Sequence, residues 1–332
     1  MRISVLFGGA SEERDVSIAS AAQVIVALRA RGHDVLAVDT AFGALSAADE
    51  QRVLTASVAV APPSGTELDA LPTTKASSLQ LPAAIGDSEL VFLALHGGSG
   101  EDGRIQALLD LAGLRYTGSG PLGSGLAMDK GVAKTLLRAA GVDTPDWLLA
   151  PQTSDAVAQA LGFPVVVKPT AQGSTVGLSV VRAPDELQGA VDLASQYGPV
   201  LIERFVRGRE LTVGVLDGRP LAVGEIMLPP DSAFSYEEKY QPDVVQEQFP
   251  ADVSTAVGET ARAAAVRAHQ ALHLSGYSRS DFRLDDDGRL WIIETNSLPG
   301  LTATSLLPQS AAAVGIDYEE LCDHICRLAL TV

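Results

Sequence analysis

The sequence predicts a mixed α/β protein made of three α+β segments rather than one doubly wound domain. The chain has 332 residues, more than the roughly 250–300 at which a single hydrophobic core stops growing. Its first third alternates apolar strand-like runs with helix-like segments, whereas its last third contains two hairpin-like pairs of strands. We therefore expect an α/β unit with an open parallel sheet at the N-terminus and α+β structure after it.

Composition limits the classes of partner. The chain is 46% hydrophobic and 20% charged, and its formal net charge of −17 would repel nucleic acid and anionic membranes. No apolar run approaches the roughly 18 residues of a membrane span. Glu12 and Glu13 follow the short apolar start, which is unlike a signal peptide. We expect Cys322 and Cys326 to be buried thiols rather than metal ligands with His324, and the protein to be cytoplasmic.

The first third predicts three buried parallel strands. They are residues 3–7, 34–38 and 90–95. Asp15 or Ser17 is expected to cap a helix that runs through Leu28 and stops at Gly32. Right-handed crossovers would then give a small open sheet with helices on its faces. Residues 41–88 are rich in Ala, Ser and Pro and predict no particular element.

The rest of the chain predicts helices and antiparallel strands. The helices are residues 130–140, 184–197 and 254–274, and the strands between them are 164–168, 178–182 and 199–203. One hairpin joins 211–216 to 220–226 at Asp217-Gly218. A second joins 280–284 to 290–295 around Asp287-Gly288. Asp-Gly suits the positive φ angles of a tight type I′ turn.

A lysine and a glycine-rich loop suggest phosphate binding. Lys168 ends a predicted strand and is followed by Gly173, Ser174 and Thr175. Glycine lets the backbone approach an anion, successive N–H groups can cradle phosphate oxygens, and lysine adds a positive charge. The alternative is an ordinary surface loop after an edge strand. Lys130 opens a helix and is a second candidate, although alone it would be a solvated helix lysine.

Three oxygen-bearing side chains on the second hairpin suggest a divalent-metal site. Glu294 and Asn296 are two residues apart, so they project from one face of a strand. Asp281 on the partner strand can reach the same face. Carboxylate and amide oxygens suit Mg²⁺ or Mn²⁺ that bridges phosphates. The alternative is a solvated polar face, but Pro299-Gly300 follows directly and does not prolong the strand.

Seven motifs in one order carry a family resemblance. They are GGASEERDVS (8–17), LHGGSGEDG (95–103), MDK (128–130), VKPTAQGSTVG (167–177), YEEKY (236–240), RSDF (279–282) and ETNSLPGLTATSL (294–306). In this order they resemble the ATP-grasp enzymes and, within them, the D-alanine–D-alanine ligase family. The resemblance implies a three-domain ATP-grasp architecture with domains 1–118, 119–203 and 204–332. ATP would be gripped between the last two, under a lid loop of residues 229–249.

The resemblance also implies the nucleotide and metal contacts. Lysines would bind the ATP phosphates, a short segment would hold adenine, a glutamate would take the ribose hydroxyls, and an aromatic ring, Phe234 or Phe205, would stack on the base. These residues are Lys130, Lys168, Glu203, Arg204, Phe205, Val206, Glu210, Phe234 and Lys239. Asp281, Glu294 and Asn296 would bind two Mg²⁺ or Mn²⁺ ions, with Glu294 between them.

The remaining implied residues surround the amino-acid substrates. Glu13 would orient the first amino group, with His96 nearby, while Ser174 and Tyr240 would link to the closed lid. Arg279 and the backbone N–H of Gly300 would stabilise the oxyanion. Ser305 and Leu306 would receive the second carboxylate. For these residues the sequence alone favours an ordinary role. Glu13 could belong to a capping cluster with Arg14 and Ser17, Tyr240 could be a loop aromatic, and Ser305 could cap a helix that begins at Leu306.

The implied activity is ATP-dependent joining of two D-alanines through an acyl phosphate, for peptidoglycan precursor synthesis, in an enzyme that is commonly a homodimer. The Lys239-Tyr240 pair resembles the form specific for D-alanine. An ATP-grasp ligase for a different amino or hydroxy acid acceptor is the main alternative, and a non-catalytic ATP-binding protein is the other. The sequence does not indicate which group takes the proton from the attacking amine.

Overall fold

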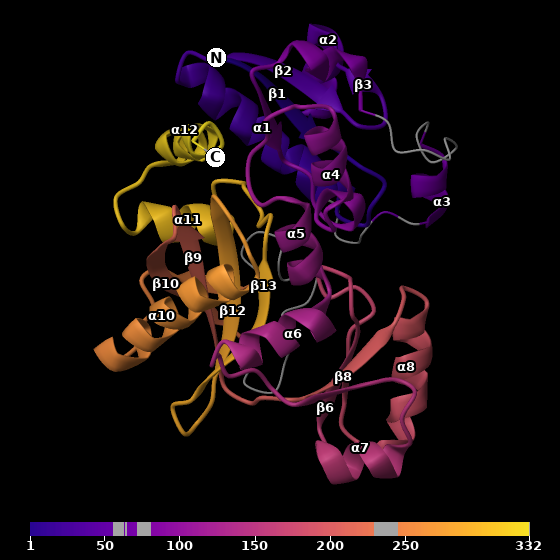
Figure 1. Cartoon of the computed structure of the whole chain (residues 1–332). Helices are drawn as coiled ribbons and strands as arrows, with labels where there is room; N and C mark the ends of the chain where they lie inside the picture. The colour runs from indigo at the N-terminus through magenta and orange to yellow at the C-terminus, as the bar shows by residue number, and fades with distance from the viewer. Residues whose placement is uncertain (56–62, 64, 72–80, 229–244, 332) are drawn as a thin grey trace.

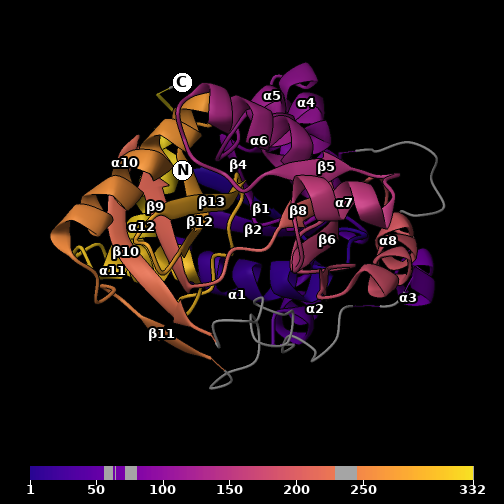
Figure 2. The same ribbon diagram turned by 90° about the horizontal axis from the view of Figure 1, so that it is seen from below.

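The computed structural model describes residues 1–55, 63, 65–71, 81–228 and 245–331. Three sheets lie within these residues. In Figure 1 the N-terminal sheet sits above the other two sheets, and Figure 2, seen from below, shows those two side by side. No helix among the described residues is long and apolar enough to cross a membrane. The predicted α/β class with an N-terminal open sheet is confirmed.

The N-terminal sheet has the strand order β3-β2-β1-β4. Its central strands are parallel, as predicted, and β3 is an antiparallel edge. The strands are β1 (Arg2–Phe7), β2 (Asp34–Asp39), β3 (Gly43–Ala44) and β4 (Leu90–Leu93). The helical segments are α1 (Arg14–Ala30), α2 (Ala47–Val53), α3 (Gly65–Asp69), η2 (Ala83–Asp87), η3 (Gly98–Gly100) and α4 (Arg104–Leu111). Every residue of β4 is buried, which explains its continuous apolar sequence.

The predicted cap of the first helix is wrong. Helix α1 begins at Arg14, so Asp15 and Ser17 lie inside it, and it continues past Leu28 to Ala30. Ser17 does not cap because its hydroxyl is used elsewhere. Its Oγ accepts a hydrogen bond from the N–H of Gly8 (2.8 Å) and donates to the carbonyl of Ala94 (2.6 Å). Ser17, whose sequence context predicts the start of a helix, therefore joins two loops at the end of the parallel sheet.

The central sheet has the order β5-β8-β6-β7. The strands are β5 (Trp147–Leu149), β6 (Val165–Pro169), β7 (Ser179–Val181) and β8 (Val200–Arg204), and the helical segments are α7 (Ser154–Ala160), η4 (Pro184–Glu186) and α8 (Leu187–Ser195). Strand β6 is an interior strand and Lys168 is 5% exposed. The alternative of a surface loop after an edge strand is therefore wrong for Lys168.

The C-terminal sheet has the order β11-β10-β9-β12-β13. The strands are β9 (Arg209–Leu216), β10 (Arg219–Met227), β11 (Gln246–Gln248), β12 (Tyr277–Leu284) and β13 (Leu290–Asn296). The helices around it are α5 (Pro121–Met128), α6 (Lys130–Ala139), α10 (Thr255–Ala271) and α11 (Leu306–Ala312). Ala133 and Leu137 of α6 pack into the same core as Ala265 of α10 and Val213 of β9, so α6 carries Lys130 to the edge of this sheet.

Only one of the two predicted Asp-Gly turns has the expected form. Asp217 and Gly218 have φ angles of 53° and 67°, as a type I′ turn requires. The second connection is a five-residue loop between β12 and β13. There the carboxylate of Asp285 accepts hydrogen bonds from the N–H groups of Asp287 (3.1 Å) and Arg289 (2.8 Å). The aspartate that begins this loop organises it, and the tight-turn prediction at Asp287 is wrong.

The C-terminal helix joins the N-terminal core. Helix α12 (Tyr318–Leu328) packs against α1, which Figure 1 also shows. Cys322 and Cys326 are buried free thiols in this core, as predicted. Burial raises the pKa of both thiols, Cys322 to about 12. The last helix therefore links the first and last parts of the chain beside the site.

Candidate active site

Two adjoining cavities lie where the three sheets meet. The first, about 820 Å³ including its open mouth, lies between the central and C-terminal sheets. The second, about 1150 Å³, lies between α1 and the turn that follows β13. Gly173, Ser174 and Glu294 line both cavities, so a group bound in one directly faces the other.

The two predicted phosphate lysines both line the first cavity. Lys130 is 9% exposed, so it is not an ordinary solvated helix lysine. Its Nζ donates to the carbonyl of Gln172 (2.6 Å) and lies 3.4 Å from Oε2 of Glu294. Lys168 Nζ lies 3.1 Å from Oε1 of Glu203. The lysines thus hold the glycine loop and two acidic residues around one space.

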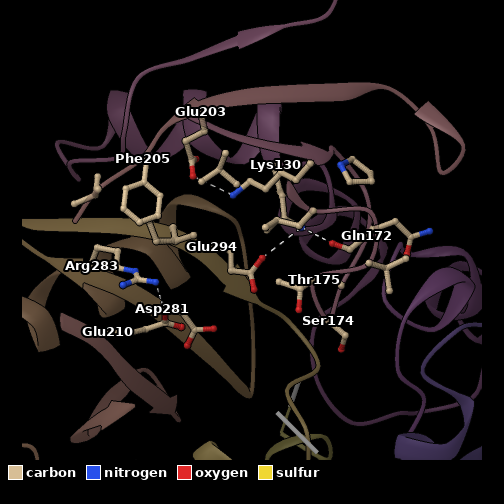
Figure 3. Close-up of a pocket in the computed structure, with 18 of the residues that line it drawn as sticks. Lys130, Gln172, Ser174, Thr175, Glu203, Phe205, Glu210, Asp281, Arg283 and Glu294 are labelled. Carbon is tan, nitrogen blue, oxygen red and sulfur yellow. Dashed lines mark hydrogen bonds and ion pairs between the residues drawn. The ribbon is translucent and has the colours of Figure 1, made fainter. Parts of the chain in front are cut away.

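The two ends of this cavity are lined by different kinds of side chain. Glu203 and Phe205 lie at one end, Glu294 lies near the middle, and Ser174 and Thr175 lie on the other side of it (Figure 3). The segment predicted to hold adenine, residues 203–206, lines the wall in full. The arrangement suits a long ligand that has a planar apolar end and an anionic end.

A buried lysine that the sequence did not single out fixes Glu203. Lys134 is 1% exposed, and its Nζ lies 2.5 Å from Oε2 of Glu203 and 2.6 Å from Oγ1 of Thr144. Burial lowers the pKa of Lys134 to about 8, although Glu203 acts in the opposite direction. Burial alone would raise the pKa of Glu203, but Lys134 and Lys168 outweigh it and keep that pKa below its ordinary value. Glu203 is therefore an ionised carboxylate that two lysines hold in place, and it can accept hydrogen bonds.

Two arginines, Arg283 and Arg204, lie in the wall of the first cavity. Arg283, which the sequence analysis did not identify, lies 2.9 Å from Oε2 of Glu210, the residue predicted to bind ribose. The guanidinium of Arg204 lies over the Trp291 ring, 4.5 Å from its centroid. Both arginines line the cavity. Glu210 is thus held in place by a partner from the next strand, β12.

The predicted metal ligands come together through strand register. Asp281 on β12 is paired with Glu294 on β13, and Arg279 with Asn296, with an irregularity immediately after Asp281. Asn296 Nδ2 lies 3.2 Å from Asp281 Oδ2. Thr212, a buried residue of β9 that the sequence analysis missed, donates to Asp281 Oδ1 (2.7 Å). The residues meet on one face of the sheet, as predicted.

This set of donors fits a hard divalent ion. Two carboxylates and an amide oxygen are suitable ligands for Mg²⁺ or Mn²⁺, which commonly complete their coordination with water and substrate phosphates. Within the described part of the chain, no group of three or more His, Cys, Asp or Glu could hold a metal ion.

The second cavity begins at Glu13. The hydroxyl of Ser174 donates to the carboxylate of Glu13, which joins the glycine loop to the start of α1. A Cβ added at Gly173 would lie 2.6 Å from Glu13 Oε2, so this glycine permits the close approach. Glu13 stands at the N-cap position of α1 without capping it through its side chain. The alternative of a capping cluster is therefore wrong for Glu13.

His96 also lines this cavity and is 3% exposed. Its Nε2 lies 3.0 Å from Ser20 Oγ and its Nδ1 lies 3.2 Å from the carbonyl of Leu298. A carbonyl can only accept, so Nδ1 carries the proton of that bond. Glu101 Oε1 lies 3.7 Å from Nδ1. The ring is therefore held by three parts of the chain.

The residues predicted to stabilise the oxyanion and bind the second carboxylate line the far side. Arg279, Gly300, Ser305 and Leu306 all belong to this cavity. Arg279 Nη2 lies 2.8 Å from Asp281 Oδ2, which connects this side of the cavity to one of the predicted metal ligands. Ser305 stands before α11 but makes no capping bond. Its Oγ instead accepts from the N–H of Thr302 (3.1 Å), so the capping alternative is wrong.

Three predicted residues lie outside the described part of the chain. They are Phe234, Lys239 and Tyr240, and of the predicted lid only residues 245–249 are described. Their roles therefore stay predictions. Phe205, the other candidate for stacking on adenine, does line the first cavity.

Two family models match the chain. The model described as D-ala D-ala ligase N-terminus matches residues 2–119, and the model described as D-ala D-ala ligase C-terminus matches residues 135–327. The chain belongs to the D-alanine–D-alanine ligase family. The matched regions include Glu13 and His96 on the N-terminal side and Lys168, Asp281 and Glu294 on the C-terminal side.

Known D-alanine–D-alanine ligases match over their full length. The chain is 40% identical to the enzyme of Gloeobacter violaceus, covering 99% of this chain and 100% of that one. It is 41% identical to the enzyme of Gluconobacter oxydans, with 99% of each chain covered. The crystal structure of the Bacillus anthracis ligase complexed with ATP superimposes with a TM-score of 0.77 at 30% identity, covering 100% of this chain and 98% of that chain. The predicted ATP-grasp fold is confirmed.

Proposed function

We propose that this member of the D-alanine–D-alanine ligase family joins two D-alanines into D-alanyl-D-alanine with ATP, for peptidoglycan precursor synthesis. Curated relatives of that name match over almost the whole chain. The single observation that carries the proposal is the junction of the two cavities at Gly173, Ser174 and Glu294. A nucleotide in one cavity and amino acids in the other would meet there.

The first step is transfer of a phosphoryl group. A carboxylate is a poor acyl donor because oxide is a poor leaving group. The carboxylate of the first D-alanine therefore attacks the γ-phosphorus of ATP and becomes an acyl phosphate, while the bond from that phosphorus to the β–γ bridging oxygen breaks and ADP leaves. Lys130 and Lys168 neutralise charge on the phosphates, and Glu13 accepts hydrogen bonds from the ammonium group of the amino acid. Phosphoryl transfer depends mainly on such positioning and charge neutralisation.

We propose Asp281, Glu294 and Asn296 as ligands of two divalent ions, Mg²⁺ or Mn²⁺. When bound, these ions would neutralise the charge of the phosphate oxygens and orient them. Neighbouring residues hold the two carboxylates of this site in position. Thr212 holds one oxygen of Asp281, and Lys130 lies beside Glu294. The two carboxylates thus already have fixed positions on neighbouring strands.

The second step forms the amide bond. The amine of the second D-alanine attacks the acyl carbon, and the carbonyl oxygen becomes negatively charged. Arg279 and the N–H of Gly300 would stabilise that oxygen, and one such donor is typically worth ~2.7–4 kcal/mol. Ser305 and Leu306 would bind the second carboxylate. Water would destroy the acyl phosphate, so we propose that the lid of residues 229–249, with Lys239 and Tyr240, excludes it.

The remaining proposals concern the whole protein. We propose that its domains are 1–118, 119–203 and 204–332. The three sheets support this division, although α5 and α6 pack on the C-terminal sheet and α12 packs on the first domain. We further propose a cytoplasmic homodimer that binds neither nucleic acid nor membrane. The net charge of −17 and the dimeric state common among similar enzymes support this proposal.

The variant Glu294→Gln tests the mechanism. It removes one carboxylate from the metal-ligand set and the acidic partner of Lys130 at nearly unchanged volume. We expect no detectable dipeptide formation and an unchanged circular dichroism spectrum. Glu259→Gln is the matched control, because Glu259 is an exposed residue of α10 outside both cavities. Normal turnover by purified Glu294→Gln would refute the metal-ligand proposal.

A further inference from the structure

Two acidic residues of the second cavity, Glu101 and Glu247, have no place in the mechanism above. Four glutamates among the described residues line this cavity: Glu13, Glu101, Glu247 and Glu294. Ser174 donates to Glu13, Glu101 lies 3.7 Å from His96, and Glu294 lies 3.4 Å from Lys130. In the part of the chain that the structure describes, the hydrogen-bond partner of Glu247 is a neutral amide, that of Gln309.

Glu247 lies at the end of the cavity that would receive the second amino acid. It belongs to the edge strand β11, opposite Ile226 of β10. Gln309, one turn into α11 after Ser305, donates from Nε2 to Glu247 Oε2 (2.5 Å) and to the carbonyl of Thr304 (2.6 Å). These two bonds fix the amide and therefore the carboxylate. Glu247 is thus held next to the segment proposed to bind the second carboxylate.

This placement answers a question that the mechanism leaves open. The amino group of D-alanine is mostly an ammonium ion at neutral pH. An ammonium ion has no lone pair, so it must lose a proton before it can attack the acyl phosphate. A carboxylate at the acceptor end would attract the ammonium ion and could take that proton. Glu13 is committed to the first substrate and to Ser174, and Glu294 is one of the proposed metal ligands.

We infer that Glu247 is the general base that takes a proton from the amino group of the second D-alanine. This inference rests on the proposed ligase function. One proton passes from the ammonium nitrogen to the carboxylate of Glu247, and the freed lone pair forms the C–N bond. The C–O bond to phosphate then breaks, and phosphate leaves with that electron pair. It also takes the second proton from nitrogen, so the products are a neutral amide and hydrogen phosphate.

The surroundings of Glu247 suit this role. Burial raises the pKa of Glu247 above its ordinary value, although the hydrogen bond from Gln309 and the charge of Arg279 act in the opposite direction. A raised pKa makes a carboxylate a better base at neutral pH, and general bases typically contribute ~10²–10⁴-fold to rate. Arg279 is the charged residue of β12 that acts on Glu247. Its positive charge keeps the carboxylate available as an anion.

The test measures acyl-phosphate formation and dipeptide formation separately in the variant Glu247→Gln. Glutamine keeps the size of the side chain and can still hydrogen-bond to Gln309, but it cannot take a proton. We expect dipeptide formation to slow by ~100-fold or more. Formation of the acyl phosphate from ATP and the first D-alanine should be unchanged. Hydroxylamine is already unprotonated at neutral pH, so its capture of the acyl phosphate should also be unchanged. Glu259→Gln is the matched control, with wild-type rates throughout.

Two results would overturn the inference. One is dipeptide formation by Glu247→Gln at the wild-type rate. The other is a parallel loss of dipeptide formation and hydroxylamine capture, which would show that Glu247 only supports the structure around α11. A wild-type protein that makes no dipeptide would refute the proposed function itself. The wild-type control therefore distinguishes failure of the function from failure of this role for Glu247.

Discussion

Acid should destabilise the protein through one buried histidine behind the site. His269 is 5% exposed, and its Nδ1 lies 2.8 Å from the hydroxyl of Ser278, the residue before Arg279 on β12. Burial lowers the pKa of His269 from 6.5 to about 4. The folded protein therefore resists protonation of this ring, whereas the unfolded chain takes up a proton below pH 6.5.

The size of the effect follows from this difference in pKa. The stability that neutral His269 contributes is complete above pH 6.5 and is lost as the pH falls towards 4. At 1.36 kcal/mol per unit, the full difference is roughly 3 kcal/mol, and about 2 kcal/mol of it is lost by pH 5. Other acidic groups also titrate in this range, so the effect of His269 must be measured as a difference between variants.

The assay is urea unfolding followed by circular dichroism at neutral pH and at pH 5. Between these two pH values, His269→Gln should lose about 2 kcal/mol less stability than the wild type, because glutamine does not titrate. His273→Asn is the control, since His273 is an exposed histidine in the loop after the same helix. It should keep the wild-type dependence on pH. An equal loss in the wild type and His269→Gln would refute the argument.

Three further predictions concern the cavities. Gly173→Ala should reduce kcat/KM for D-alanine by roughly 100-fold, because its Cβ would displace Glu13, 2.6 Å away. Lys134→Met should raise the KM for ATP by about tenfold, or about 1.4 kcal/mol, since Glu203 would lose the closer of its two lysines. Tyr240→Phe should weaken the closure of the lid and increase ATP hydrolysis that is not coupled to dipeptide formation, measured as phosphate released per dipeptide.

Matched controls make these predictions specific. Gly189→Ala lies in helix α8, where an added Cβ meets nothing within 4 Å, and should leave kcat/KM unchanged. Unchanged kinetics of Gly173→Ala would show that Glu13 does not need its observed position. An unaltered KM for ATP in Lys134→Met would exclude a role for Lys134 in binding the nucleotide. Unchanged coupling in Tyr240→Phe would argue against the proposed link to the lid.

The sequence predicted the parts of the site that lie in local motifs. Lys168 with its glycine loop, and the pair Glu294 and Asn296, could be identified because each depends on neighbours within a few residues. Lys134 and Glu247 could not, because their roles depend on contacts with residues far along the chain, on β8 and α11 respectively. No short-range pattern distinguishes such residues from ordinary charged positions on a helix or an edge strand.

The errors in the predicted fold have the same origin. Ser17 has the sequence context of a helix cap, but its hydroxyl binds loops that β1 and β4 bring to the same edge of the sheet. The second hairpin contains Asp-Gly, yet Asp285, two residues earlier, shapes the whole loop. The packing of α12 on α1 could not be predicted, because the sequence does not show which helix surfaces meet.

The most direct test of the central claim is the stoichiometry of the complete reaction. Purified protein would be incubated with D-alanine, ATP and Mg²⁺, and the dipeptide and ADP would be quantified by chromatography. We expect one ADP for each D-alanyl-D-alanine, and no dipeptide when either ATP or Mg²⁺ is omitted. Release of ADP without dipeptide, or efficient joining of D-alanine only to a different acceptor, would refute the proposed function.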